Sequence, residues 1–207
     1  MTISLDGFTS GLNQRLDKPF GDNTDALNDW VFRLKSFQEM LGRGGGETGP
    51  SDDVVRERLA NLGAVVMGRN MFGGGTGPWP EPQWNGWWGS EPPYHAPVFV
   101  LTHHPRPPQT MSGGTTFHFV TDGIEAALGR AREAAGSRDV VIGGGATTVR
   151  QYLRAGAVDE FELHVVPTLV GAGERLFDDL EGSLGQLKQV RVVVGEDVTH
   201  IKYRIDR

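Results

Sequence analysis

The chain has 207 residues, a formal net charge of -6, no cysteine and 38% hydrophobic residues. This composition is typical of a soluble globular protein, and it excludes a disulfide framework and the basic surface that nucleic-acid binding requires. No apolar run approaches the roughly 20 residues of a membrane-spanning helix, and residues 1–11 lack the basic segment and apolar core of a signal peptide. We therefore expect one cytoplasmic domain over residues 1–207, with neither a membrane nor a nucleic acid as partner.

The first part of the chain alternates helical and strand patterns after a short opening strand. Between residues 26 and 41, apolar side chains recur at spacings of three and four, which predicts one helix with its N-cap at Thr24 or Asp25. Ser51 is expected to cap a second helix, and the continuous apolar run at residues 63–68 predicts a buried strand. A helix followed by a buried strand is typical of an α/β protein.

Residues 73–97 combine glycines and prolines with Trp79, Trp84, Trp87 and Trp88 and show neither the helical nor the strand period. A loop of this length usually serves a function or is disordered. The tryptophans favour packing over disorder. Two interpretations stay open, a lid or interface segment and a satellite apolar cluster that pins a surface loop.

The rest of the chain continues the alternation and closes with a hairpin. The expected elements are strands at 97–102, 115–121, 139–144 and 159–167, helices at 124–135 and 148–154, and a two-stranded hairpin at 189–206. Alternation along residues 159–167 places Glu160, Glu162 and His164 on one face, which we expect to meet solvent or a partner. The pattern predicts a three-layer α/β domain with a mixed sheet whose last strands are antiparallel.

Groups suited to anions follow three of the predicted strands. They are Gly68, Arg69 and Asn70 after the first, Thr102, His103 and His104 after the second, and Gly143, Gly144 and Gly145 after the third. Glycines before a helix allow a phosphate to approach backbone N–H groups and the positive end of the helix dipole, although a tight packing turn would also require them. Because ligands of open α/β sheets bind beyond the carboxyl ends of the strands, these groups indicate one crevice.

Five segments together resemble the dihydrofolate-reductase-like family, in particular the branch of the reductase domain of the bifunctional riboflavin-biosynthesis deaminase/reductase. They are ISLDGF, VVMGRNMF, VFVLTHHP, VVIGGGATTVRQYL and VDEFELHVVPTLVGAGERLF, in this order. The resemblance covers nearly the whole chain apart from residues 73–97. It implies an NADPH-binding fold with a mainly parallel central sheet, an antiparallel C-terminal hairpin and a homodimeric assembly.

The resemblance also implies which residues hold the cofactor. Gly68, Arg69 and Asn70 would lie at the pyrophosphate, Thr102 with His103 or His104 near the adenosine 2′-phosphate, and Gly143, Gly144, Gly145, Ala146 and Thr147 along the pyrophosphate and nicotinamide. The chain departs from the family pattern at two places. Met71 stands where dihydrofolate reductases usually have threonine, and Gly143 stands where the riboflavin reductases usually have glutamate.

A reductase of this kind needs a proton donor or an ordered water beside the cofactor. The resemblance implies a carboxylate on the first helix, for which Asp29 is the nearest match, and Asp6 is the second candidate, although aspartate before glycine is common in turns. Glu160, Glu162 and His164 have no recognised metal spacing, so we expect no metal site. Hydrolase and kinase signature motifs are missing from the sequence.

The sequence thus predicts an NADPH-dependent reductase of a small heterocyclic substrate, similar to 5-amino-6-(5-phosphoribosylamino)uracil reductase. An alternative is a non-catalytic regulatory module that binds NADP(H), another nucleotide or a flavin, or a flavin or pterin carrier. The loop residues Leu169, Val170, Leu176 and Phe177 offer modest support for a homodimer, and core packing would explain them equally well.

Overall fold

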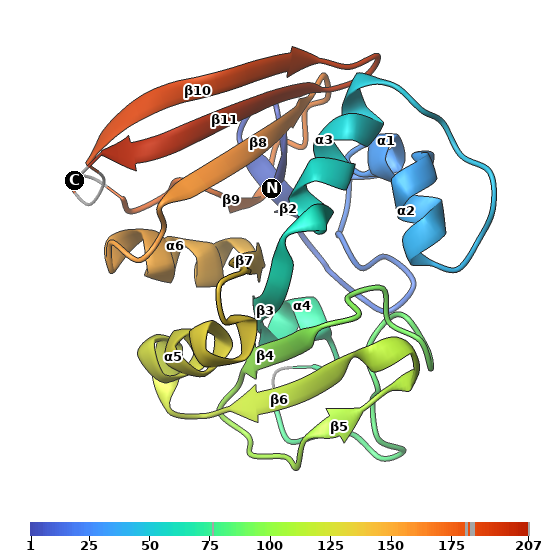
Figure 1. The fold of residues 1–207 in the computed structure, drawn as a ribbon, viewed down its shortest axis with the longest axis vertical. Coiled ribbons are helices and arrows are strands. Elements are labelled where there is room, and N and C mark those ends of the chain that lie inside the picture. The colour runs from blue at the N-terminus through green and yellow to red at the C-terminus, as the bar shows by residue number, and fades with distance from the viewer. Residues whose placement is uncertain (76, 181, 183–184, 207) are drawn as a thin grey trace. The chain divides into compact units, whose positions relative to one another are not determined.

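The computed structural model describes residues 1–75, 77–180, 182 and 185–206 (Figure 1). Its contacts divide the chain into two compact units, which we describe separately. Unit 1 comprises Met1–Arg56 and Val149–Arg207, and unit 2 comprises Glu57–Thr148. Helices α3 (Pro50–Ala60) and α6 (Ala146–Arg154) run across the two boundaries.

Unit 2 is built on a five-stranded sheet in the order β5-β6-β4-β3-β7. Its strands are β3 (Leu62–Gly68), β4 (Pro97–Leu101), β5 (Gln109–Thr110), β6 (Thr116–Val120) and β7 (Asp139–Gly144). All neighbours pair in parallel except β5, which is antiparallel to β6. The parallel strands expected from the sequence are therefore confirmed, whereas the short β5 was not predicted.

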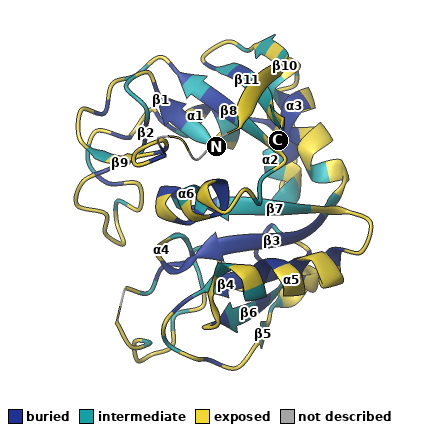
Figure 2. Ribbon diagram, turned by 90° about the vertical axis from the view of Figure 1, so that its left-hand side faces the viewer, coloured by how far each residue is buried: buried dark blue, intermediate teal, exposed yellow. Residues whose placement is uncertain are grey.

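The inner strand β3, which lies between β4 and β7, is buried from its second residue onward, as the apolar run predicts (Figure 2). Helix α5 (Gly123–Ala135) packs against β3 and β4 through Ala127, Leu128, Ala131 and Ala135. Small alanine side chains let the helix lie close to the sheet, so a short amphipathic helix suffices to bury this face. Unit 2 also contains the one-turn helix α4 (Arg69–Phe72) and the 3-10 turn η1 (Ser112–Gly114).

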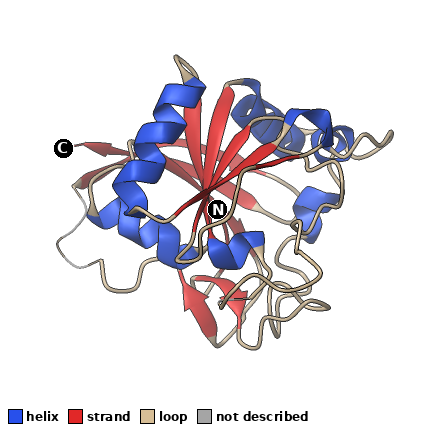
Figure 3. Ribbon diagram, turned by 90° about the horizontal axis from the view of Figure 1, so that it is seen from below, coloured by secondary structure: helices blue, strands red, loops and turns tan. Residues whose placement is uncertain are grey.

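The tryptophan-rich loop at 73–97, whose residue 76 lies outside the described residues, packs within unit 2. The indole N–H groups of Trp84 and Trp87 donate to the backbone oxygens of Phe72 and Met71, at 2.8 and 2.9 Å. Trp79 and Trp84 also pack against the apolar core cluster of the unit. The expected packing is confirmed, and the contacts are those of a cluster that pins the loop to α4. Figure 3 shows the long segments of the chain without regular structure.

Unit 1 contains a four-stranded sheet in the order β1-β8-β11-β10. Strand β1 (Thr2–Ser4) is parallel to β8 (Glu160–Val166), which is antiparallel to β11 (Thr199–Asp206), and β11 pairs with β10 (Gln186–Val194) in the predicted C-terminal hairpin. Strands β2 (Phe8–Gly11) and β9 (Gly173–Arg175) form a separate antiparallel pair.

The prediction of one helix over residues 26–41 is wrong, as are both proposed N-caps. Two short helices occur instead, α1 (Asp29–Phe32) and α2 (Lys35–Met40). Leu34 is extended between them, because the backbone on either side pairs with Glu47: Lys35 N donates to Glu47 O and Glu47 N to Arg33 O, both at 2.8 Å. The apolar spacing was real, but a returning segment competes for the helical hydrogen bonds.

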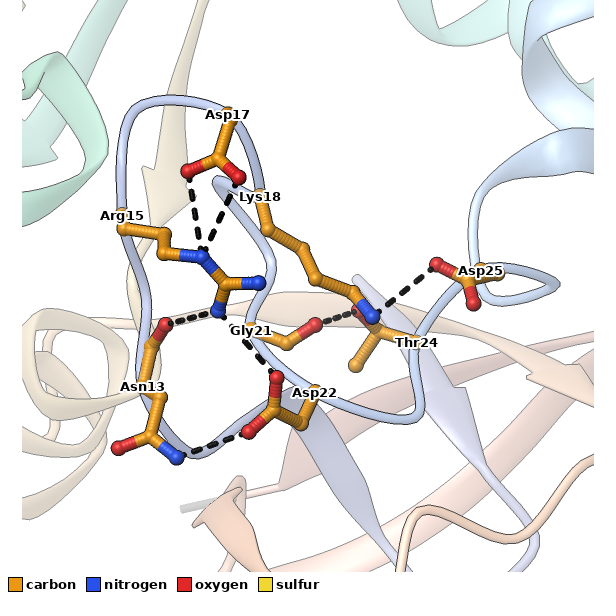
Figure 4. Close-up of polar contacts among 8 residues, drawn as sticks. All are labelled: Asn13, Arg15, Asp17, Lys18, Gly21, Asp22, Thr24 and Asp25. Atoms are coloured by element: carbon orange, nitrogen blue, oxygen red, sulfur yellow. Dashed lines mark hydrogen bonds and ion pairs between the residues drawn. The ribbon is translucent and has the colours of Figure 1, made fainter.

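Thr24 and Asp25 instead belong to a polar loop that precedes α1 (Figure 4). Thr24 Oγ1 donates to Gly21 O at 2.7 Å, and Asp25 pairs with Lys18 at 3.5 Å. Within the same loop, Arg15 forms ion pairs with Asp17 and Asp22, and Asn13 Nδ2 donates to Asp22 at 2.8 Å. These groups fix the loop's own path; such exposed pairs contribute little to stability individually.

One further expectation is corrected in unit 1. His164 does not meet solvent, because it is 2% exposed and lies opposite His200 of β11 under the ring of Trp30. The strand parity was right, but helix α1 covers the end of this sheet face. Among the described residues, no helix is long and apolar enough to cross a membrane.

Candidate functional site

The carboxyl ends of three parallel strands lie side by side in unit 2. Strand β3 runs between β4 and β7, and the register pairs Gly68 with Leu101 and Met67 with Gly144. The segments that follow are Arg69–Asn70, Thr102–His104 and Gly145–Thr147. The structure therefore brings all three predicted anion-binding segments to one edge of one sheet, where ligands of open α/β sheets bind.

Gly68 is required by close packing at this edge. Its backbone, at φ -81° and ψ 160°, is open to any residue. A Cβ at this position, however, would lie much closer to the Oγ1 atom of Thr148 than 3.0 Å, a distance below which Cβ contacts essentially never occur. Thr148 is buried in the first turn of α6. The glycine therefore lets the start of this helix lie directly against the end of β3.

The glycines after β7 have different roles. Gly144 has φ 130°, a conformation that L side chains rarely adopt, and its peptide bond to Gly145 is cis. A Cβ on Gly143 would be tight against Val65, at 3.2 Å. A Cβ on Gly145 would meet no described atom within 4 Å, so open space borders the chain there.

Helix α6 begins directly after these glycines. Ala146 is buried, and Thr147 is exposed in the first turn. The first N–H groups of a helix have no acceptor within it and carry the positive end of its dipole. Open space at Gly145 beside such donors suits a phosphate group.

Thr102, His103 and His104 form a compact turn after β4. The Thr102 hydroxyl is buried and accepts the His104 N–H at 3.1 Å, while the Thr102 N–H donates to Val120 O at 3.0 Å. The His103 side chain is exposed and that of His104 is half-buried. Thr102 thus shapes the turn, and His103 is the group of this segment most open to a ligand.

Arg69 takes an unexpected position in the tryptophan-rich loop. Its Nε and Nη2 atoms donate to the carbonyls of Gly73 and Gly74 at 3.1 and 2.9 Å, and its guanidinium stacks 3.2 Å from the ring centroid of Trp79. The buried Nη1 has no hydrogen-bond partner among the described residues. Burial, with Arg106 nearby, lowers the pKa of the Arg69 guanidinium. Asn70, its neighbour, is exposed.

Arg106 is a buried arginine near Arg69 that the sequence analysis did not single out. It is 9% exposed, its guanidinium lies 4.9 Å from the Trp79 ring centroid, and it donates to Trp84 O at 2.7 Å. Burial lowers its pKa as well. The available signal was an arginine among prolines just after HH, near a loop rich in aromatic rings. Two buried guanidiniums thus lie close to the Trp79 ring.

The two carboxylates predicted for catalysis both lie in unit 1, and Asp6 is engaged in a turn. Its Oδ1 accepts from Ser4 Oγ at 2.5 Å and from Val170 N at 3.1 Å, and its Oδ2 accepts from Gly171 N at 2.8 Å. The Ser4 hydrogen bond, aided by the two backbone donors, lowers the pKa of Asp6 to about 2. Asp6 is therefore ionised at neutral pH and anchors the segment after β8.

Asp29 is the first residue of α1 and is exposed, next to the buried Trp30. Its carboxylate also suits the positive end of this short helix. Unlike that of Asp6, its carboxylate accepts no hydrogen bond from a backbone turn among the described residues. Asp29 therefore keeps a carboxylate that a substrate or a water could reach.

Comparison with known proteins gives consistent matches. A family model described as the RibD C-terminal domain matches residues 1–200. The chain is similar to the crystal structure of a protein from Shewanella sp. PV-4 that is named for riboflavin biosynthesis. The match covers 99% of this chain and 96% of the Shewanella chain, with 21% sequence identity and a TM-score of 0.61. A second match is a Thermotoga maritima enzyme, diaminohydroxyphosphoribosylaminopyrimidine deaminase/5-amino-6-(5-phosphoribosylamino)uracil reductase. This match covers 99% of this chain and 54% of the Thermotoga chain, at 13% sequence identity and a TM-score of 0.57.

A similar curated sequence is the Bacillus subtilis protein YwjB, which is described as uncharacterized. It is 36% identical over 62 residues, which span 30% of this chain and 35% of that protein. The match to the family model confirms the resemblance to the riboflavin-type reductase branch that the five sequence segments indicate. The structural matches confirm the fold expected from them, a mixed α/β fold with a mainly parallel sheet and an antiparallel C-terminal hairpin.

Proposed function

The chain belongs to the family of the RibD C-terminal domain, and we propose from this premise that it is an NADPH-dependent reductase of a small heterocyclic, pyrimidine-like substrate. The observation that carries the proposal is the shared sheet edge of Gly68, Leu101 and Gly144, which collects three turns suited to anions. The name of the Thermotoga maritima match supports the substrate class. Gly143 replaces the glutamate usual in riboflavin reductases, so the ring's substituents are expected to differ.

The cofactor would be held by residues of unit 2. Backbone donors at Gly145, Ala146 and Thr147 would bind the pyrophosphate, and open space at Gly145 fits this role because no described atom fills it. His103, with Thr102 and His104 shaping its turn, would contact the 2′-phosphate. When bound, NADPH supplies the hydride of the reduction.

Arg69 and Asn70 complete the proposed cofactor residues, in different ways. Asn70 is exposed after β3 and would reach the pyrophosphate directly. Arg69 would act on the pyrophosphate indirectly, because its positive charge is buried next to Gly68 and is held there by the Gly73 carbonyl. Its Nη1 is buried without a hydrogen-bond partner among the described residues and is closed to a ligand, so the guanidinium would contribute through its charge.

For the proton we propose Asp29 ahead of Asp6. A carboxyl group whose pKa is about 2 has no proton to donate at neutral pH, and the oxygens of Asp6 already accept three hydrogen bonds. Asp29 would orient the substrate or a water that delivers the proton. The variant Asp29→Asn is expected to lose turnover while the affinity for NADPH stays unchanged.

The test of cofactor binding uses Thr147. Thr147→Glu places a negative charge in the first turn of α6, which helps a helix N-terminus but repels a phosphate. The variant should therefore keep or raise the unfolding free energy while its NADPH affinity falls by about tenfold or more; Thr147→Gln, of similar size and neutral, should bind nearly as wild type. Equal affinities of the two variants would contradict a phosphate at this helix.

The alternative, a regulatory NADP(H)- or flavin-binding module, predicts a different result with the same protein. Such a module would bind its ligand and have no turnover for Asp29→Asn to remove. A yellow or fluorescent preparation would favour a flavin or pterin carrier. Oxidation of NADPH upon addition of pyrimidine-like compounds would favour the reductase.

We also propose that the protein is a cytoplasmic homodimer with no nucleic-acid or membrane partner. Of the loop residues first considered, Val170 and Leu176 are buried core residues, whereas Leu169 and Phe177 are exposed. Stronger support comes from β10, the edge strand of the unit 1 sheet, whose apolar Leu187, Val190, Val192 and Val194 are exposed. A long apolar edge strand usually requires a cover, which a second copy would provide. Light scattering at micromolar concentration tests this.

A further inference from the structure

Two histidines face each other inside the unit 1 sheet. His164 of β8 lies opposite His200 of β11, and their Nδ1 atoms are 2.8 Å apart. The rings are 2% and 1% exposed, and Trp30 packs on both, with centroid distances of 4.9 and 5.1 Å. At this separation one ring donates the Nδ1 proton and the other accepts it. Each imidazole therefore fixes the tautomer of the other.

The other nitrogen of His200 contacts a hydroxyl. His200 Nε2 lies 2.9 Å from Oγ of Ser51, which stands in the first turn of α3. When His200 donates from Nδ1 to His164, its Nε2 is an acceptor for the Ser51 proton. A nucleophile bound to a base, which is in turn oriented by a third group, is the arrangement that activates serine in enzymes of unrelated folds.

Ser51 opens on a cavity within unit 1. The cavity has a volume of about 100 Å³, and its lining includes Trp30, Leu34, Ser51 and Val198. A water molecule takes up about 30 Å³ in the liquid, so an acetyl-sized group fits. The Trp30 indole N–H is buried and has no acceptor among the described residues.

Arg33 and Asp52, which line the cavity, are paired with neighbouring groups. At the cavity's edge Arg33 pairs with Asp197 at 2.6 Å and with Glu47 at 3.6 Å. Asp52, adjacent to Ser51, accepts Ser36 N at 2.6 Å and pairs with Arg56. The carboxylates are thus engaged elsewhere, and the helix start supplies N–H groups without intrahelical acceptors next to Ser51.

We propose that Ser51, His200 and His164 form a second active centre, an acyl-transfer site for short-chain carboxylic esters. Ser51 is the nucleophile, His200 the general base and His164 the positioning residue. This centre uses no residue of the proposed reductase site. Failure of one function therefore leaves the other untouched.

The chemistry balances without any cofactor. Ser51 Oγ forms a bond to the acyl carbon as its proton passes to His200 Nε2. The bond from the acyl carbon to the alcohol oxygen then breaks, and the alcohol leaves with the proton from His200. A water molecule, deprotonated by His200, attacks the acyl-serine, releases the acid and returns the proton to Ser51, so one ester and one water give one acid and one alcohol.

The first test uses p-nitrophenyl acetate with the intact protein in the absence of NADPH. We expect a burst of nitrophenolate and an acetyl group on the Ser51 peptide in mass spectrometry. Ser51→Ala should lose both, whereas Ser112→Ala, which removes an exposed hydroxyl elsewhere, should retain both. Acetylation confined to lysines or the N-terminus, and equal in Ser51→Ala, would overturn the proposal.

The second test separates base and positioning roles from structural ones. His200→Gln should lower the acylation rate by about 100-fold or more. His164→Asn keeps a polar group for His200 and should be faster than His164→Leu, with the affinity for ester unchanged. Equal acylation rates in these two variants would reject the positioning role.

The third test holds even if the histidine variants fail to fold. The chain has no cysteine, so Ser51→Cys introduces a unique thiol. Beside His200 this thiol should react with iodoacetamide at least about tenfold faster than the thiol of Ser112→Cys at neutral pH. An equal or slower rate would overturn the proposal and leave Ser51 as a link between α3 and β11.

Discussion

The substitution Gly68→Ala tests the packing of the sheet edge. The backbone angles of Gly68 suit alanine, so any loss of stability comes from the new methyl group, which would press against Thr148 Oγ1. Forcing an atom into a filled site typically costs about 1–3 kcal/mol. We expect this loss in the free energy of unfolding, measured by urea denaturation with an unchanged slope.

The same structure predicts how the loss can be relieved. After the hydroxyl, the next nearest atom to the added methyl is Thr148 Cβ at 3.5 Å, an ordinary contact. In a Thr148→Ala background, Gly68→Ala should therefore cost about 0.5 kcal/mol or less, giving a coupling of about 0.5–3 kcal/mol in a double-mutant cycle. The control Gly129→Ala, in helix α5 with open space around it, should stabilise by about 0.5–1 kcal/mol. An equal cost of Gly68→Ala in both backgrounds would refute the close packing of α6 on β3.

Three further predictions concern the loop, the turn and the assembly. Trp79→Leu removes the stacking on Arg69 and should lower the free energy of unfolding by about 1–2 kcal/mol in urea titrations. The folded-state pKa of Asp6 is about 2, below the ordinary 3.8, so ionised Asp6 stabilises the fold fully above pH 3.8 and loses this effect as the pH falls towards about 2. The difference in stability between wild type and Asp6→Asn should therefore shrink over this range in thermal melts. A constant difference would contradict the assigned hydrogen bonds. For the proposed homodimer, Val192→Glu should give a monomer in light scattering, whereas Lys188→Glu on the same strand should leave the assembly unchanged.

Much of unit 2 could be predicted because its signals are local. The buried strand β3 is a continuous apolar run, and glycines mark the ends of β3 and β7, so alternation of strands and helices was enough to place three turns at one edge. What the sequence did not reveal is the direction of the Arg69 side chain, which turns into the tryptophan-rich loop. That direction depends on hydrogen bonds to the backbone carbonyls of Gly73 and Gly74. Every residue has a backbone carbonyl, so the residue types do not reveal these acceptors.

Unit 1 shows where periodicity is insufficient. The apolar spacing over residues 26–41 is helical, yet backbone pairing of Lys35 with the distant Glu47 divides the helix. His164 has the parity of a solvent-facing residue, yet Trp30 covers it. In both cases a contact distant in sequence overrides a correct local pattern.

The most direct test of the central claim is a titration of the purified protein with NADPH and with NADH, followed by tryptophan quenching and energy transfer to the nicotinamide. The account predicts NADPH binding at least about tenfold tighter, or about 1.4 kcal/mol, because His103 and its turn would contact the 2′-phosphate. Equal affinity for the two, or binding of neither, would contradict it.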